Sequence, residues 1–127
     1  MLNDLQYQEL PDSMAIYDHW DKAAKRIVNH LKKHAQAWIF LDPVDPVKLN
    51  IPDYFDIVKE PMDLGTIGQK LNTNQYLRAH DFIKDVQMMF DNCLLYNGES
   101  THVSQMCKAV NEEFKKQFTL LSFEYYL

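Results

Sequence analysis

The chain has 127 residues, of which 46% are hydrophobic and 13% aromatic, and its formal net charge is −5. A chain of this length has room for one domain with a buried core, and its apolar content excludes disorder as the general state. The negative charge is the wrong sign for a protein whose main activity is to grip a phosphate backbone. It suits a basic partner instead.

The sequence also excludes several classes of protein. With only three glycines, it is poor in the tight turns that an all-β fold needs. No apolar run approaches the roughly 20 residues that span a bilayer, and the N-terminus lacks the pattern of a signal peptide. The two cysteines fall within helical patterns, which favours a reduced, intracellular setting. We therefore expect an intracellular protein without a membrane partner.

Residues 16–35 have the periodicity of a helix. Apolar side chains recur at three- and four-residue steps and share one face: Ile16, Trp20, Ala23, Ala24, Ile27, Leu31 and Ala35. Acid-before-base pairs four residues apart, such as Asp21 and Lys25, support the same helix. Residues 1–15 show no clear period, and we interpret them as an N-terminal leader.

A proline-rich segment follows, from Trp38 to Met62. It holds four of the five prolines, and each one removes a backbone donor and restricts the residue before it. The segment is nevertheless rich in large apolar side chains, whose exposure would forfeit roughly 1.5–3 kcal/mol each. We therefore predict a long ordered loop that forms the wall of a pocket, with a short helical turn that has Pro52 at its first position.

A second, shorter helix is predicted after the loop. Asp63 is placed to cap it, its apolar face holds Leu64, Ile67 and Leu71, and residues 72–74 close it as a turn. Two glycines within so short a helix, Gly65 and Gly68, each cost about 0.5–1 kcal/mol relative to alanine. We therefore expect another element to pack close against them.

Two longer helices complete the pattern. The third has its apolar face at Phe82, Val86, Met89, Phe90 and Cys93 and ends at Gly98. The fourth is predicted to be capped by Ser100, with its face at Val103, Met106, Cys107, Val110, Phe114, Phe118 and Leu121. Their short connection predicts an antiparallel pair. We expect an all-α four-helix bundle over residues 16–121, with an apolar C-terminal extension, 122–127, packed on it.

Asn97 is the unusual residue of the third helix. It continues the apolar face one turn beyond Cys93, where a buried unpaired amide would cost about 1–3 kcal/mol. By itself, Asn97-Gly98 is an ordinary turn dipeptide that ends a helix. Together with the apolar loop and the neighbouring Tyr96, however, it would give a hydrophobic slot with one orienting amide, which is the general anatomy of a small-ligand site.

The stretch from Trp38 to Asn97 resembles a bromodomain, the acetyl-lysine-binding module of chromatin proteins, and most closely the BET type. The residues that carry the resemblance are Trp38-Ile39-Phe40, Pro43-Val44-Asp45, Val47-Lys48-Leu49-Asn50, Pro52-Asp53-Tyr54-Phe55, Pro61-Met62-Asp63-Leu64-Gly65-Thr66-Ile67, and Asn92-Cys93 through Tyr96-Asn97. The resemblance covers about residues 16–120 and implies a left-handed bundle of four helices, called Z, A, B and C. One departure is Ile39, where the family often has proline.

The resemblance also implies roles for individual residues. Asn97 would donate to the acetyl carbonyl, and Tyr54 would reach the same oxygen through a water. Phe40 would lie beside the acetyl methyl. The remaining residues that the resemblance assigns to the slot, its gate and the shelf beside its entrance are Val44, Leu49, Ile51, Cys93, Tyr96, Val103 and Trp38.

The implied function is that of a non-catalytic reader that binds acetylated histone tails, H4 or H3, and brings its parent protein to chromatin in the nucleus. We expect a monomeric domain that needs no cofactor or metal and makes no direct sequence-specific contact with nucleic acid. Five acidic side chains lie in segments that should rim the opening and attract charged lysines of a tail: Asp42, Asp45, Asp53, Asp56 and Glu99.

Other classes of function are less well supported by the residues. His30 and His34 share one side of the first helix, but no further ligand accompanies them at metal-binding spacing. Cys93 and Cys107 lie in apolar faces, which favours packing over a nucleophilic role. Two alternatives stay open: a helical scaffolding or dimerisation module, and an enzyme acting on small amides with Tyr54 or Tyr96 as its acid.

Overall fold

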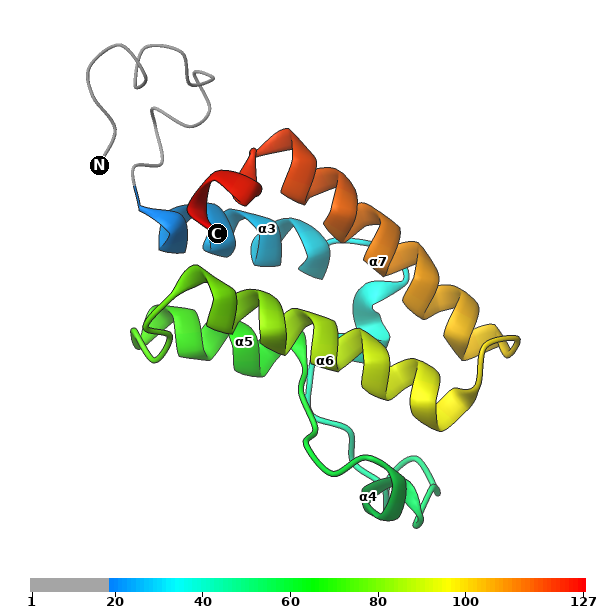
Figure 1. Cartoon of the computed structure of the whole chain (residues 1–127). Coiled ribbons are helices and arrows are strands. Elements are labelled where there is room, and N and C mark those ends of the chain that lie inside the picture. The colour runs from blue at the N-terminus through cyan, green and yellow to red at the C-terminus, as the bar shows by residue number, and fades with distance from the viewer. Residues whose placement is uncertain (1–18) are drawn as a thin grey trace, which may run out of the picture.

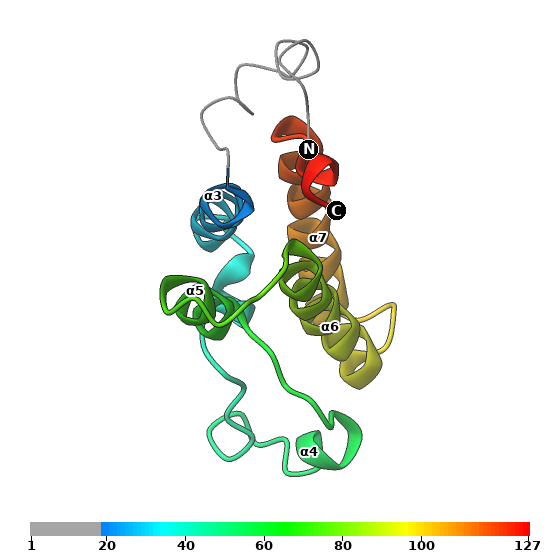
Figure 2. The ribbon, with the colours of Figure 1, turned by 60° about the vertical axis from the view of Figure 1, so that its left-hand side comes forward.

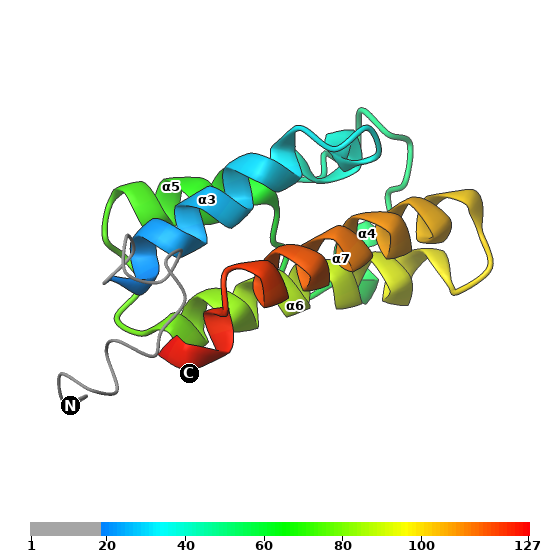
Figure 3. The same cartoon turned by 90° about the horizontal axis from the view of Figure 1, so that it is seen from above.

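The computed structural model describes residues 19–127, and all regular structure within that range is helical (Figure 1). The elements are the α-helices α3 (Trp20–Lys32), α4 (Tyr54–Ile57), α5 (Leu64–Asn72), α6 (Ala79–Asn97) and α7 (His102–Leu120), and the 3-10 helices η1 (Ala37–Phe40) and η2 (Phe123–Tyr126). The four long helices α3, α5, α6 and α7 form a bundle in which α6 and α7 run antiparallel (Figures 1 and 3). The predicted all-α four-helix bundle is confirmed.

Helix α3 buries the apolar face that its period predicts. Its buried residues are Ala23, Ala24, Ile27, Val28 and Leu31. The helix ends at Lys32, three residues before the predicted end, because Lys33 and His34 donate to carbonyls only three residues back and the His34 ring accepts from Gln36 N at 3.0 Å. Residues 16–18 of the predicted helix and the leader 1–15 lie outside the described residues.

The predicted helix caps were partly right. Asp63 caps α5, and its two carboxylate oxygens accept from the backbone N and the hydroxyl of Thr66 at 2.9 and 2.6 Å. Ser100 was the wrong cap for the last helix: Thr101 is the cap, because its hydroxyl accepts from Ser104 N at 3.1 Å. The short turn in the loop begins at Tyr54 rather than Pro52, so its first position was also predicted wrongly.

A row of aromatic rings fills the core along the bundle. Consecutive ring centroids are 5.4–6.1 Å apart in the series Phe40, Phe90, Phe114, Phe118, Phe123 and Phe82. Phe123 of η2 is fully buried, and it holds the C-terminal residues against the start of α6. The core therefore extends without interruption from the C-terminal 3-10 helix η2 to the start of the long loop.

No helix within residues 19–127 has the length and apolar character needed to cross a membrane.

The loop between η1 and α5 leaves the bundle and returns to it, carrying α4 beneath the helices (Figures 1 and 2). Its return is fixed by a close backbone contact at Gly65, where a side-chain Cβ would lie 2.5 Å from the carbonyl oxygen of Leu41. At Gly68 a Cβ would lie 3.0 Å from Lys32 Nζ. The expectation that another element packs close to both glycines is confirmed, and the contact at Gly65 places the start of the loop against α5.

Candidate functional site

The long loop is tied to helix α6 at two points. The Asn92 amide donates to the carbonyl of Glu60 at 2.8 Å, and the Tyr96 hydroxyl donates to Asp53 Oδ1 at 2.6 Å. The two α6 residues are four positions apart, so they present both groups from one side of the helix. Because Asp53 and Glu60 flank α4, these bonds hold the tip of the loop against the last turns of α6.

The Asp53 contact changes the acidity of Tyr96. The hydrogen bond to Asp53 raises the pKa of the Tyr96 phenol, because ionisation would place two negative charges side by side. The phenol is therefore a permanent donor at neutral pH. Sequence reasoning assigned Tyr96 to the site but missed both Asn92 and the Asp53 contact, which joins residues 43 positions apart.

The loop also has internal hydrogen bonds. The Asp45 carboxylate accepts from the backbone N of Val47 and of Lys48, each at 3.1 Å, as in an Asx-turn. Ile51 N donates to the Pro46 carbonyl at 2.9 Å, across a bend in which Asn50 has a positive φ of 57°. Asparagine tolerates this left-handed conformation better than most residues. The loop is thus an ordered segment, as the sequence predicts.

Two aromatic residues of the candidate site are buried where the loop meets α6. Phe40 packs edge-to-face on Phe90, with ring centroids 5.4 Å apart. Tyr54 is 6% exposed, and its ring lies 5.1 Å from the ring of Tyr96. Burial raises the pKa of the Tyr54 phenol, with a further contribution from Cys93, so it too stays a neutral donor.

Asn97 lies at the last position of α6 and is partly buried. Its Nδ2 donates to the Cys93 carbonyl one turn back at 2.9 Å and lies 3.7 Å from Cys93 Sγ. An amide nitrogen carries two hydrogens, and both contacts direct the side chain; sulfur is only a weak acceptor, so a ligand oxygen could take over the hydrogen that now meets Cys93 Sγ. Gly98 follows with a φ of 78° and ends the helix, which keeps the amide at an accessible end.

The other predicted site residues differ in how closely they join this cluster. Val44, Ile51 and Val103 are partly buried, and Val103 packs against the core at the start of α7. Trp38 and Leu49 are 65% and 56% exposed. Ile39, the departure from the resemblance, is partly buried against the core. The structure therefore brings Phe40, Tyr54, Cys93, Tyr96 and Asn97 to the junction of loop and α6, and leaves Trp38 and Leu49 as outlying apolar surfaces.

The acidic residues expected at the rim are all exposed: Asp42, Asp45, Asp53, Asp56 and Glu99. Asp53 and Asp45 also hold the loop through the bonds described above, so part of this negative charge is used to order the backbone. The carbonyl of Glu99 accepts from Lys108 Nζ at 2.7 Å, which ties the α6–α7 connection to α7.

His30 and the two cysteines have structural contacts. His30 Nε2 lies 2.6 Å from Glu113 Oε1, and within residues 19–127 no group of three or more His, Cys, Asp or Glu side chains could hold a metal ion. The Cys107 Sγ lies 3.6 Å from the Phe90 carbonyl in the core. A hydrogen bond with Cys93 and burial raise the pKa of Cys107, which therefore stays an uncharged thiol.

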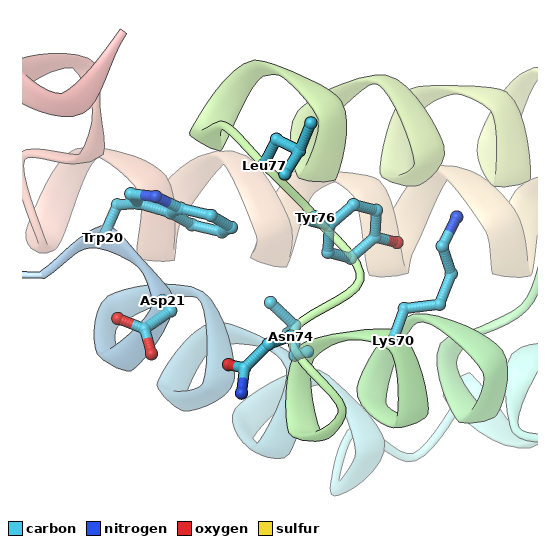
Figure 4. A pocket seen from close by; sticks show the side chains of 7 residues that line it. Trp20, Asp21, Lys70, Asn74, Tyr76 and Leu77 are labelled. Atoms are coloured by element: carbon cyan, nitrogen blue, oxygen red, sulfur yellow. The ribbon is translucent and has the colours of Figure 1, made fainter.

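A separate hollow of about 190 Å³ lies at the other end of the bundle (Figure 4). It is lined by Trp20, Asp21, Lys70, Leu71, Asn74, Tyr76 and Leu77. Two of its polar groups are paired with each other's partner: Lys70 Nζ and the Tyr76 hydroxyl both bind Asp85 Oδ2, at 2.7 and 2.5 Å, and burial together with the Asp85 bond raises the pKa of Tyr76. The network joins α5 to α6 and takes up the donors of Lys70 and Tyr76.

The loop–α6 junction can thus bind a small, neutral, hydrogen-bond-accepting group. It offers as donors one directed amide and the neutral phenol of Tyr54, since the single hydroxyl hydrogen of Tyr96 is already given to Asp53, and nothing in the described cluster supplies a nucleophile paired with a base.

A Tyr96→Phe change tests the contribution of the loop tether. The ring stays, but the bond to Asp53 is lost, so the loop is held less firmly and a ligand must order it on binding. We expect the affinity for a ligand of this site to fall about two- to fivefold, with the melting temperature nearly unchanged because the pair is at the surface. Calorimetric titration of the parent and the variant measures the difference. Unaltered affinity would show that the tether does not order the site.

Comparisons with known proteins agree with this description. The family model described as "Bromodomain" matches residues 24–109. The SWR1 complex bromodomain subunit bdf1 of Schizosaccharomyces pombe is 50% identical over 95 residues, which are 75% of this chain and 16% of that protein. Bromodomain-containing factor 1 of Saccharomyces cerevisiae is 50% identical over 88 residues, 68% of this chain and 13% of that protein. The chain spans less than a fifth of the length of either relative.

Solved structures show the same architecture. The second bromodomain of Candida albicans Bdf1, bound to an imidazopyridine, superposes with a TM-score of 0.73 at 44% identity, covering 76% of this chain and 94% of that one. The bromodomain of human BAZ1A superposes with a TM-score of 0.77 at 33% identity, covering 83% and 96%. These bundles are matched over nearly their whole length.

Proposed function

This chain belongs to the bromodomain family, and we propose that it is a non-catalytic reader that binds acetylated lysine at the junction of its long loop and helix α6. The observation that carries the proposal is the Asn97 amide, which lies at the end of helix α6, is directed by its bond to the Cys93 carbonyl, and places its second hydrogen against only a weak acceptor, Cys93 Sγ. In the proposed complex this donor binds the acetyl carbonyl.

The surrounding side chains complete the proposed complex. The neutral phenol of Tyr54 reaches the same oxygen through a water molecule, and Phe40 lies beside the acetyl methyl. Cys93, Val44, Ile51 and Leu49 line the slot, Tyr96 closes one side, Val103 gates the entrance, and Trp38 covers the lysine stem. Leu49 and Trp38 are largely exposed and thus have apolar area to bury when a ligand binds.

Discrimination against unmodified lysine follows from desolvation. Moving an ammonium into an apolar slot carries a penalty of several kcal/mol, whereas one neutral hydrogen bond contributes only about 0.5–1.5 kcal/mol net. Acetylation removes the charge and leaves an amide oxygen that the Asn97 donor can satisfy. Selectivity therefore arises mainly from the slot, and Asn97 sets the orientation of the ligand.

The partner we propose is an acetylated histone tail, of H4 or H3, read by a monomeric domain in the nucleus. The exposed acids around the loop, such as Asp42 and Asp56, suit a tail whose other lysines keep their charge. The names of two relatives support a role in transcription: one is the SWR1 complex bromodomain subunit bdf1, and another, from Arabidopsis thaliana and 40% identical over 94 residues, is transcription factor GTE10. The proposed role is to bring the parent protein to acetylated chromatin.

The test is an array of H3 and H4 tail peptides, each present unmodified and acetylated at one lysine. We expect binding to acetylated peptides only, at least about tenfold above the unmodified forms, because the ammonium penalty exceeds 1.4 kcal/mol. Mass spectrometry of the recovered peptides checks turnover. Binding that ignores acetylation would favour a scaffolding module, and loss of the acetyl group would favour an amide-cleaving enzyme.

A further inference from the structure

Two cysteines from different helices lie against the same turn of α6. Cys93 of α6 and Cys107 of α7 are the two cysteines of the chain, and both are buried and free. Cys107 Sγ lies 3.6 Å from the carbonyl oxygen of Phe90. That carbonyl points along α6 toward residue 94, and Phe90 and Cys93, three positions apart, are neighbours on one face of the helix. The antiparallel packing of α6 and α7 (Figure 3) therefore brings the second thiol beside the first.

The two thiols interact and differ in acidity. The Cys107 thiol donates a hydrogen bond to the Cys93 sulfur, which outweighs burial and lowers the pKa of Cys93. The Asn97 amide, 3.7 Å from that sulfur, acts in the same direction. The bond to Cys93, together with burial, raises the pKa of Cys107. Because the thiolate is the nucleophilic form of cysteine, Cys93 is the more reactive thiol of the two.

The exposure of the two thiols differs in the same sense. Cys93 is 9% exposed and Cys107 is 1% exposed. Cys93 lies one turn before Asn97, whose amide stands at the accessible end of α6. A small oxidant that enters the candidate site therefore meets Cys93 first, and Cys107 lies deeper, in the core.

This arrangement is that of an attacking and a resolving cysteine. Redox-sensing pairs have one thiol of lowered pKa that an oxidant can reach and a second thiol beside it. A buried cysteine that only fills space needs neither contact with another thiol nor an approach from solvent. Cys93 and Cys107 have both features.

We propose that Cys93 and Cys107 are a reversible redox pair that hydrogen peroxide closes into a disulfide, and that the closed pair weakens ligand binding at the candidate site. In the first step the Cys93 thiolate attacks one oxygen of the peroxide. The O–O bond breaks, and the hydroxide that leaves takes up the proton released by Cys93. The products are a sulfenic acid on Cys93 and one water.

In the second step the Cys107 sulfur attacks the sulfur of the sulfenic acid. The S–S bond forms, the S–O bond breaks, and the departing hydroxide takes the proton of the Cys107 thiol and leaves as a second water. The two thiols lose two electrons in all, and the peroxide gains them. A dithiol reductant such as dithiothreitol reverses the change by thiol–disulfide exchange.

Closure of the pair changes the floor of the candidate site, and this part of the inference rests on the proposed function. A disulfide holds its sulfurs about 2.05 Å apart, much closer than two hydrogen-bonded thiols, so Cys93 Sγ moves toward α7 and away from the Asn97 amide. The same bond draws α7 toward α6 at Cys107. Val103 lies one turn before Cys107 on α7, so it moves with that helix and narrows the entrance that it is proposed to gate.

The first test follows the disulfide itself. The parent chain is treated with hydrogen peroxide, quenched with catalase and unfolded in N-ethylmaleimide. We expect a monomer that takes up no maleimide, that takes up two after reduction by dithiothreitol, and whose digest contains the peptides of Cys93 and Cys107 linked together. Two thiols that still react with maleimide after peroxide treatment, or a disulfide that links two copies of the chain, would overturn the proposal.

Single variants separate the two steps. Cys107→Ala lacks the resolving thiol, so peroxide should leave a sulfenic acid on Cys93 that dimedone traps. Cys93→Ala lacks the attacking thiol, so its Cys107 should stay a free thiol under the same treatment. Circular dichroism checks that both variants are folded, and the linked peptide of the parent tests the bond without them. Equal dimedone labelling of the two variants would overturn the assigned order of attack.

The second test measures ligand affinity in the two redox states. An acetylated H4 peptide is titrated by calorimetry into the oxidised parent and into the same sample after dithiothreitol. We expect the oxidised form to bind about fivefold or more weakly, because a displaced pocket wall no longer fits the ligand, and reduction to restore the affinity. Methionine sulfoxide needs its own reductases, so recovery in dithiothreitol assigns the change to the cysteines.

The two tests fail in different ways. A disulfide that leaves the peptide affinity unchanged would overturn the control of the site by the redox pair. A reduced parent that binds no acetylated peptide, but still closes the Cys93–Cys107 disulfide, would contradict the proposed function alone.

Discussion

An Asn97→Ala variant is expected to lose most of its affinity for acetylated peptides while remaining folded. The substitution removes the one directed amide of the site and leaves the acetyl carbonyl without its partner, which costs about 1–3 kcal/mol, or roughly 5- to 150-fold in affinity. The fold should persist, because Asn97 is the last residue of α6 and alanine is a better helix former than asparagine.

Isothermal titration with an acetylated tail peptide measures the affinity, and circular dichroism measures the melting temperature. Asn111→Ala is a matched control, because Asn111 is also a partly buried helical asparagine but lies in α7. We expect it to bind like the parent. If Asn97→Ala bound the peptide as tightly as Asn111→Ala, the amide would have no part in recognition and the proposed site would be wrong.

Gly65→Ala should be strongly destabilising, in contrast to the same change at Gly68. At Gly65 the added Cβ would lie 2.5 Å from a backbone oxygen of Leu41, so the loop or α5 must shift. Such overpacking typically costs about 1–3 kcal/mol. For a domain of this size that corresponds to a melting temperature lower by roughly 4–12 °C.

Gly68→Ala is the matched control in the same helix. Its Cβ would come closest to the end of the flexible Lys32 side chain, at 3.0 Å, which can move aside, and would make an ordinary van der Waals contact with Val28 at 3.7 Å. The helix preference of alanine over glycine, about 0.5–1 kcal/mol, should then leave the variant as stable as the parent or slightly more stable. Thermal unfolding of both variants decides the question. Similar melting temperatures would show that the Leu41 contact does not constrain the loop.

Apolar periodicity and capping residues in the sequence predicted the positions of the helices well and the exact ends of the helices less well. The apolar periods of α3, α6 and α7 and the Asp63 cap depend on residues within two turns of each other, so they can be read from the sequence. Ser100 and Thr101 are both good capping residues, and only the backbone geometry that lets Thr101 accept from Ser104 N decided between them. The early end of α3 at Lys32 was likewise set by backbone hydrogen bonds of the turn that follows it. No glycine or proline near this position marks that end in the sequence.

The amino-acid sequence by itself determined that this protein is a four-helix bundle with an ordered apolar loop and an amide at a helix end, because helical period, proline content and residue chemistry are local properties. The tertiary structure alone decided which distant groups meet. Tyr96 binds Asp53 and Asn92 binds Glu60 only because the loop folds back on α6. Lys25 and Arg26 of α3 share one surface hollow with Gln117 only because α3 packs beside α7, and contacts between residues so far apart in the chain depend on the packing of the whole core.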